Sequence, residues 1–357
     1  MKDTSYLFLI YILYCLSAIL FSFLINSLFL KFSSNLGTRN TTENIIRWSN
    51  TTKPSFGGIS FFILFLLSII FYPILFGEQQ PFFNTQLLGI ISASTLAFLM
   101  GLSDDAYNTR PLLKLFIQIG CSLILIYTGT YISLFANNYT NYAFTLFWIV
   151  SIMNSINMLD NMDAITTITS ITIILNALFV IFLNYEFIDK MHIILLVGVM
   201  SAMIGFLFFN WNPAKMFMGD TGSQFLGLFL GAISIIYFWN TSDSKGELPP
   251  SKQFFVAVLS FIIPIIDTTT VVINRLLKGK SPFIGGKDHT THCLYFMGLS
   301  EKNIARLYFL IGLISMLFNY LIIKGIPNWG YLHMLLFSVY CIVLFAFLYV
   351  PTRKYGH

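Results

Sequence analysis

The sequence predicts an all-α, polytopic membrane protein with about 11 transmembrane helices. Of its 357 residues, 56% are hydrophobic and 17% aromatic, and only 10% are charged. Soluble domains carry about 25% charged residues, so this composition excludes an ordinary soluble domain. The apolar residues also gather in stretches of roughly 20, the length that crosses a bilayer as a helix. Short polar loops separate these stretches, and nothing in them points to nucleic-acid binding.

Eleven hydrophobic segments can be placed along the chain, with ten spans as the alternative count. They are 6–30, 57–76, 85–102, 112–132, 143–160, 164–184, 190–209, 221–240, 252–275, 303–323 and 330–350. The first is too long for the apolar core of a signal peptide and no cleavage site follows it, so we interpret it as a span. No internal repeat is visible, and we expect one integral membrane domain over residues 1–357.

The basic residues predict the orientation of these spans. When loops are numbered alternately, fifteen Lys and Arg residues fall on one side and five on the other. The positive-inside rule makes the richer side cytoplasmic, so we expect the N-terminus outside and the C-terminus in the cytoplasm, in the cell (inner) membrane. The cytoplasmic loops are then 31–56, 103–111, 161–163, 210–220 and 276–302.

Carboxylates collect on the same side and place the expected chemistry at the cytoplasmic face. A pair of them, Asp104 and Asp105, closes the third segment. Two adjacent carboxylates suit a divalent cation or a raised pKa, and Mg²⁺ prefers a few carboxylates together with substrate phosphate oxygens. A solvated loop or a helix cap is the alternative interpretation of this pair.

A second polar group closes the fifth segment. Its members recur every three residues, so neighbours share a helix face; they are Asn154, Asn157, Asp160 and Asp163. A continuous helix would spiral this row by about 60° per step, and we therefore expect a break near Asn161. A capped turn between two helices is the alternative.

A third group precedes the eighth segment, where Asn210 and Phe217 lead to Met218-Gly219-Asp220-Thr221-Gly222-Ser223. A helix N-terminus with small residues favours phosphate, but Asp220 would repel phosphate unless a cation bridged them. This conflict favours metal plus phosphate, although Asp220 could simply cap its helix.

The fourth group is the basic loop after the ninth segment, which carries His289 and His292. The pair is a weak zinc signal because no further ligands are apparent, and with the neighbouring lysines it suits an anionic phosphate. A basic loop resting on anionic lipid is the alternative. Lys53 adds a cation before the second segment, and Asp267, inside the membrane, is expected to be structural with Arg275 as its partner.

In order, these motifs resemble the polyprenyl-phosphate N-acetylhexosamine-1-phosphate transferases of glycosyltransferase family 4, from about Lys53 to Arg306. The shared features are Asp104-Asp105 followed by Lys114 and Gln118, Asn-x-x-Asn-x-x-Asp-x-x-Asp from Asn154, Phe-Asn-x-x-Pro-Ala-x-x-Phe-Met-Gly-Asp-x-Gly-Ser from Phe209, Asp267-Thr268, Ser281-Pro282-Phe283 and the histidine loop.

The resemblance implies a Mg²⁺-dependent enzyme, with Mn²⁺ as a substitute, that moves a sugar-1-phosphate from a UDP-sugar to undecaprenyl or another polyprenyl phosphate and releases UMP. Whether the protein forms a homodimer is left open. The implied catalytic residues are Asp104, Asp105, Asp160 and Asp163, with Asp104 deprotonating the lipid phosphate. The implied metal ligands are Asn157, Asp220 and Asp105. The implied substrate contacts are Lys53, Lys114, Asn210, Phe217, His289 and His292, with Asp163, Asn210 and Phe217 at the nucleotide.

The chain departs from the family pattern in two places. The family usually has Asp-Gly-x-Asp-Gly-Leu where this chain has Asn161 and Ala164 in place of the glycines, and Asn161 tolerates a left-handed backbone. The histidine motif often reads His-x-His-His-Arg, but Thr291 and Cys293 flank His292 here. This difference argues against the peptidoglycan-precursor branch and favours UDP-GlcNAc or a related sugar for surface polysaccharide, such as lipopolysaccharide O-antigen, or cell-wall glycan.

Two other function classes are weighed against this one. An ion-coupled transporter would place carboxylates near the bilayer midplane and show repeated halves, neither of which is visible. A family member without activity, acting as a scaffold, is permitted by the replaced glycines but not favoured by the retained aspartates.

Overall fold

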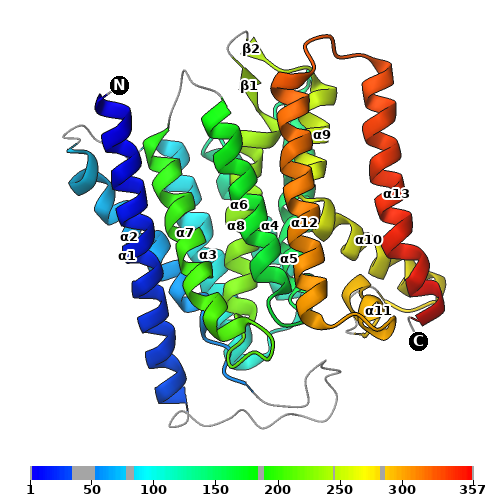
Figure 1. Cartoon of the computed structure of the whole chain (residues 1–357), viewed down its shortest axis with the longest axis horizontal. Coiled ribbons are helices and arrows are strands. Elements are labelled where there is room, and N and C mark those ends of the chain that lie inside the picture. The colour runs from blue at the N-terminus through cyan, green and yellow to red at the C-terminus, as the bar shows by residue number, and fades with distance from the viewer. Residues whose placement is uncertain are drawn as a thin grey trace.

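A computed structural model describes residues 2–33, 53–77, 84–183, 189–243, 246–281 and 286–355. It is a helical bundle (Figure 1) whose helices are α1 (Lys2–Ser33), α2 (Gly57–Phe76), α3 (Thr85–Tyr107), α4 (Pro111–Tyr127), α5 (Asn138–Leu159), α6 (Ile165–Leu183), α7 (Lys190–Asn210), α8 (Gly219–Ser234), α9 (Pro250–Ser260), α10 (Ile262–Leu277), α11 (Thr290–Phe296), α12 (Glu301–Tyr320) and α13 (Tyr331–Tyr355). Two π-helical turns, η1 (Ile235–Trp239) and η2 (Leu321–Gly325), extend α8 and α12. An antiparallel pair of two-residue strands, β1 (Ser242–Asp243) and β2 (Gly246–Glu247), is the exception to the all-α prediction.

Each of the eleven predicted segments is helical, which confirms a polytopic membrane protein. Within the described ranges, nine helices are long and apolar enough to cross a bilayer, and ten if the bent pair α9 and α10 forms one span. The bend of 76° falls at Phe261, inside the predicted segment 252–275. The remaining segment is the shorter apolar helix α4, which ends at Tyr127 and not at 132.

The third segment differs from its prediction in a way that affects the site. We placed Asp104 and Asp105 in a loop from 103, but α3 continues to Tyr107. Both carboxylates therefore project from a helix, which fixes their directions. Most of the predicted loop 31–56 and the Pro282-Phe283 part of the basic loop lie outside the described residues.

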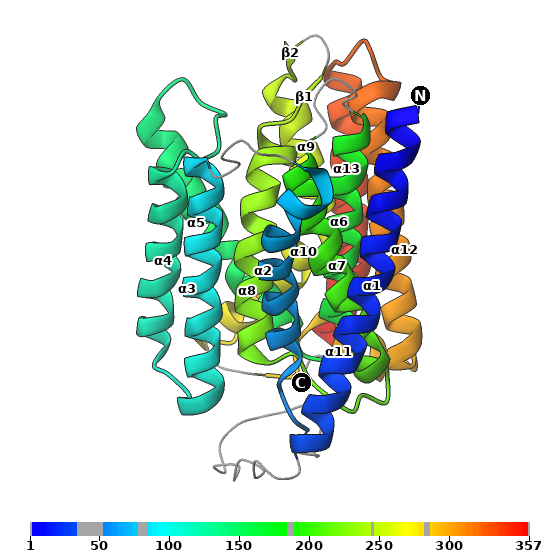
Figure 2. The ribbon, with the colours of Figure 1, turned by 90° about the vertical axis from the view of Figure 1, so that its left-hand side faces the viewer.

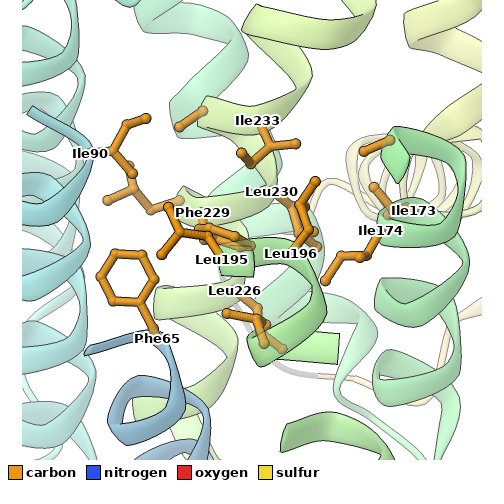
Figure 3. Packing of buried hydrophobic residues seen from close by; sticks show 14 of the residues in the cluster. Phe65, Ile90, Ile173, Ile174, Leu195, Leu196, Leu226, Phe229, Leu230 and Ile233 are labelled. Atoms are coloured by element: carbon orange, nitrogen blue, oxygen red, sulfur yellow. The ribbon is translucent and has the colours of Figure 1, made fainter. Parts of the chain in front are cut away.

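The apolar core is built around α8, whose residues from Thr221 to Ser234 are all buried. Figure 3 shows Leu226, Phe229 and Leu230 of this helix among buried side chains of the surrounding helices, such as Phe65 and Leu195. The outermost helices α1 and α13 are the least buried of the apolar helices. Only 17% and 11% of their most apolar 18-residue stretches are buried inside the bundle, as expected for surfaces that face lipid. The N-terminus of α8 thus lies in the middle of one end of the bundle.

The two chain ends lie at opposite ends of the bundle, and the motif-bearing segments gather at the end that holds α11 and the C-terminus (Figure 1). The strands β1 and β2 lie at the other end. Turned by 90°, the bundle shows α3, α4 and α5 side by side (Figure 2). Because α3 and α5 end where α4 and α8 begin, four helix termini meet in one place.

Candidate active site

Two glycines allow the helices of the site to approach closely. A Cβ on Gly58 of α2 would stand 2.1 Å from the backbone nitrogen of Gly222, and one on Gly101 of α3 would stand 2.3 Å from the carbonyl oxygen of Asp220. Small residues permit such backbone contacts between membrane helices. Because these positions have no side chain, α2 and α3 pack closely against the first turn of α8.

Asp105 caps the N-terminus of α8 from the neighbouring helix. Its Oδ1 accepts a hydrogen bond from the Asp220 nitrogen at 3.0 Å, and its Oδ2 accepts from the nitrogen and the hydroxyl of Thr221 at 2.9 and 2.6 Å. A carboxylate in this position satisfies free N–H groups and interacts favourably with the helix dipole. Both of its oxygens are thus engaged in holding α3 to α8.

Lys114 lies between the two other carboxylates. Its ammonium forms a salt bridge with Oδ2 of Asp104 and another, of 3.1 Å, with Oδ2 of Asp220. The other oxygen of Asp104 accepts from the nitrogen and hydroxyl of Thr109, both at 2.7 Å. Sequence reasoning missed Thr109, which closes the turn between α3 and α4. The Asp104 side chain is 5% exposed, whereas that of Asp220 is 31% exposed, so Asp220 is the more accessible carboxylate.

Asn157 completes this cluster from α5. Its Nδ2 donates to Oδ1 of Asp220 and to Oγ of Ser223, both at 2.8 Å. Residues that are far apart in the sequence, on α3, α4, α5 and α8, therefore converge as predicted. Ser223, which we had not singled out, belongs to the same motif as Asp220.

The donor set of this cluster fits Mg²⁺ only in part. Among the residues that the structure describes, no three His, Cys, Asp or Glu side chains form a metal site by themselves. Mg²⁺ usually takes one or two carboxylates together with water and substrate phosphate oxygens, and Asp220 would meet that need together with an amide oxygen from Asn157. Asn157 now directs its Nδ2 toward Asp220, so its amide would have to turn over to present oxygen to a cation.

The expected break after α5 is confirmed, because α5 ends at Leu159 and α6 begins at Ile165. The left-handed residue of this break is Ala164, with φ of 65°, and Asn161 does not use the left-handed conformation that it would tolerate. Burial raises the pKa of Asp160 to about 8, and the negative charges of Asp220 and Asp105 add to the effect. Asp160 therefore lies close enough to the cluster to sense its charge.

Asp163 and Asn210 bind the loop between α7 and α8 to the break. Asp163 Oδ2 accepts from the Ala214 nitrogen at 2.8 Å and from Asn212 Nδ2 at 3.1 Å. The Asn210 amide is 3% exposed; it accepts from the Ala164 nitrogen and the Thr167 hydroxyl and donates to the carbonyl of Met216. Both side chains therefore hold backbone segments in place through hydrogen bonds.

Lys53 and Phe217 lie together near the N-terminus of α8. The Lys53 ammonium is 5.1 Å from the centre of the Phe217 ring, a cation–π contact. Backbone hydrogen bonds join the same segments: the Phe217 nitrogen donates to Pro54, and the Gly57 and Gly58 nitrogens donate to Phe217 and Met218. The half-buried Phe217 ring and the cation are thus presented as a unit.

The histidine segment is anchored on Asp267, which corrects one expectation. Asp267 does not pair with Arg275: its Oδ2 lies 2.8 Å from His289 Nδ1 and its Oδ1 accepts from Thr290. Arg275 instead forms a bidentate pair with Asp288, at 2.9 and 2.8 Å. Burial alone would raise the pKa of Asp288, but the hydrogen bonds and charge of Arg275 outweigh it and hold the pKa below its ordinary value.

His292 is 2% exposed and its ring meets the His289 ring edge to face at 5.2 Å. Burial, together with the nearby His289, lowers the pKa of His292 to about 3. His292 is therefore neutral at physiological pH.

Asn161 and Thr291 connect the histidine segment to the aspartate-bearing break. The Thr291 hydroxyl donates to Asn161 Oδ1 at 2.7 Å, and Asn161 Nδ2 donates to the Met158 carbonyl at 3.0 Å. Neither residue was proposed as functional from the sequence, although both occupy the positions that depart from the family pattern. These departures from the family pattern were the signal in the sequence that could have pointed to Asn161 and Thr291.

Comparison with known proteins agrees with this geometry. Residues 87–238, which contain most of α3 and all of α4 to α8, match the model of glycosyl transferase family 4. Over this region the chain is similar to family 4 glycosyl transferases, and it is a transferase enzyme. The matched range includes Asp104, Asn157 and Asp220, so the family region contains the whole cluster around Lys114.

Three relatives illustrate the range of the family. A probable undecaprenyl-phosphate N-acetylglucosaminyl 1-phosphate transferase of Bacillus subtilis is 28% identical over 301 residues, which are 82% of this chain and 78% of the relative. A decaprenyl-phosphate N-acetylglucosaminephosphotransferase of Mycolicibacterium smegmatis is 32% identical over 32% of this chain and 30% of the relative. A phospho-N-acetylmuramoyl-pentapeptide-transferase of Thermotoga maritima is 34% identical over 35% of this chain and 36% of the relative.

Proposed function

We propose that this family 4 transferase moves N-acetylhexosamine-1-phosphate, and specifically GlcNAc-1-phosphate, from a UDP-sugar to undecaprenyl or another polyprenyl phosphate and releases UMP. The reaction would start a surface polysaccharide or a cell-wall glycan, such as an O-antigen. The observation that carries the proposal is the convergence of Asp104, Lys114, Asn157 and Asp220 at one end of the bundle.

The charge distribution of this cluster suits a reaction between two anions. A lipid phosphate oxygen forms a bond to the phosphorus that carries the sugar, the bond from that phosphorus to the bridging oxygen breaks, and UMP leaves with the electron pair. Repulsion between the anions is a main obstacle, so charge neutralisation and positioning supply most of the catalysis. Mg²⁺ held by Asp220 and Asn157 would offset the charge of the pyrophosphate.

The other residues receive the following roles in this proposal. Lys114, which already contacts two carboxylates, neutralises phosphate charge, and Asp104 accepts the proton of the lipid phosphate. Asp105 holds the first turn of α8 and so acts through Asp220. The half-buried ring of Phe217, with Lys53 over it, offers a face for the uracil base and a cation for the adjoining phosphate.

The site lies where a water-soluble and a membrane-bound substrate can meet. The helix termini that carry it stand at one end of a bundle whose outer helices present exposed apolar side chains. The distribution of Lys and Arg supports assigning this end to the cytoplasm, where UDP-sugars are found. The long isoprenoid would approach from the side, through lipid.

The direct test uses the purified full-length protein in detergent with polyprenyl phosphate and a panel of UDP-sugars. We expect Mg²⁺-dependent release of UMP and a lipid product, fastest with UDP-GlcNAc. Asp220→Ala should fold and yield no UMP. Normal turnover by that variant would refute the metal assignment, and Mg²⁺-dependent UDP-sugar binding without any product would indicate a scaffold in place of an enzyme.

A further inference from the structure

A second polar layer lies beneath the charged cluster and carries no charge. It consists of the amide side chains Gln118, Asn154 and Gln224, from α4, α5 and α8. Each lies three or four residues from a member of the cluster on the same helix, the spacing at which side chains share a helix face. The pairs are Lys114 with Gln118, Asn157 with Asn154, and Asp220 with Gln224.

All three amides lie on the same side of the cluster. α4 and α8 begin at this end of the bundle and α5 ends there (Figure 1), so Gln118 and Gln224 follow their partners into the membrane and Asn154 precedes its partner. One helical turn corresponds to about 5.4 Å. The amides therefore form a floor, one turn deeper in the bilayer than the charged residues.

The amides are hydrogen-bonded to one another across the three helices. Gln118 Nε2 donates to Gln224 Oε1 at 3.1 Å, and Asn154 Nδ2 donates to Gln118 Oε1 at 2.9 Å. Asn154 Nδ2 also donates to the Val150 carbonyl in its own helix. Gln118 is the central member, because it contacts both others.

Two of the three amides are deeply buried. Gln118 and Gln224 are each 1% exposed, Asn154 is half-buried, and Met153 and Phe225, which adjoin Asn154 and Gln224 in the sequence, are fully buried. An amide left without a partner at such depth costs free energy. Because donors and acceptors must match, the floor is satisfied in one relative register of α4, α5 and α8, whereas apolar side chains would allow several.

We propose that Gln118, Asn154 and Gln224 are positioning residues for the phosphosugar transfer, since they set the distances between Lys114, Asn157 and Asp220 one turn above. The inference rests on the proposed function. Groups that orient metal ligands without binding the metal typically change metal affinity or activity by about 10–100-fold when they are replaced. A shift of about 1 Å in a reacting geometry has an effect of similar size.

The test replaces Gln118 with Met, which has similar length but neither donates nor accepts strongly. In the full chain we expect kcat for UMP release to fall about 10–100-fold while KM for the UDP-sugar changes little. The Mg²⁺ concentration that gives half of the maximal rise in unfolding temperature, measured without substrate, should increase about tenfold. The matched control is Ser122→Ala, one turn deeper on α4, whose hydroxyl bonds only within its helix; neither quantity should change.

Gln224→Met is the second variant, because it removes a single acceptor from the floor and keeps the link between Gln118 and Asn154. We expect the same direction with a smaller effect. Folded Gln118→Met and Gln224→Met proteins with the kcat and the Mg²⁺ midpoint of the wild type would overturn the proposal. If the wild type itself releases no UMP with any UDP-sugar, the proposed function fails, while the comparison of Mg²⁺ midpoints still decides whether the floor positions the cluster.

Discussion

The hydrogen bond of 2.7 Å from the Thr291 hydroxyl to Asn161 Oδ1 joins residues that are 130 positions apart. Asn161 follows Asp160 in the break between α5 and α6, and Thr291 lies between the two histidines of the fourth motif. Two departures from the family pattern thus contact each other directly. We infer that the pair holds the histidine segment against the aspartate-bearing break.

Replacing Thr291 with Val should remove this bond while keeping the shape of the side chain. We expect a loss of about 1 kcal/mol in stability, because a partly buried hydrogen bond is lost and Asn161 Oδ1 keeps no partner from α11. UMP release should also decrease. A double-mutant cycle with Asn161→Ala, followed by thermal unfolding in detergent, measures the coupling. Strict additivity would show that the pair does not act together. Thr95→Val, whose hydroxyl bonds only within α3, is the control.

Asp105 and Asp220 should respond differently to substitution although they lie side by side. Asp105→Ala removes the cap of α8, so the stability should fall by about 1–2 kcal/mol and activity with it. Asp220→Asn leaves the cap intact and should retain near-normal unfolding temperature while losing UMP release. Chemical unfolding and activity assays on both variants check this; a stable Asp105→Ala protein contradicts the capping role.

Lys114→Gln should make stability depend more strongly on Mg²⁺. Without the ammonium, Asp104 and Asp220 lose the cation that now lies between them, so the unfolding temperature should fall in the presence of a chelator. Added Mg²⁺ should restore part of this loss and shift the variant further than the wild type. Equal shifts for the two proteins would show that Mg²⁺ does not bind near Lys114.

Asp160 gives a prediction for pH. Its pKa is raised by burial, to about 8, so the ionised form is disfavoured in the folded protein. The cost is absent below the unfolded pKa of about 4, grows as the pH rises toward about 8, and is constant above that. In Mg²⁺-free buffer Asp160→Asn should therefore stabilise the protein at alkaline pH and have little effect near pH 4, while activity is lost. A stabilisation that is largest in acid would contradict this reasoning.

Gly58→Ala should be severely destabilising, because its Cβ would stand 2.1 Å from the backbone nitrogen of Gly222, which cannot move without displacing α8. We expect a loss of about 3 kcal/mol or failure to accumulate in the membrane. Gly120→Ala is the matched control: nothing lies within 4 Å of its Cβ. Alanine inside a helix is favoured over glycine by about 0.5–1 kcal/mol, so this variant should be at least as stable as the wild type.

The outcome for Asp267 shows where sequence reasoning reaches its limit. We chose Arg275 as its partner because the two are close in the sequence, but His289 and Thr290, brought back by α11, take that place. The partner of Arg275 is likewise found beyond its own helix, at Asp288. Partners on other elements depend on how helices pack, which spacing along one helix does not encode.

The sequence by itself determined the helical segments, the break after α5 and the set of motifs, because hydropathy and residue spacing act over one or two helical turns. Only the tertiary structure decided that Asp105 caps α8, that Lys114 joins Asp104 to Asp220, and that three amides lie beneath them. These contacts depend on close approach at Gly58 and Gly101. The approach is possible because the missing side chains let helices from distant parts of the chain meet backbone to backbone.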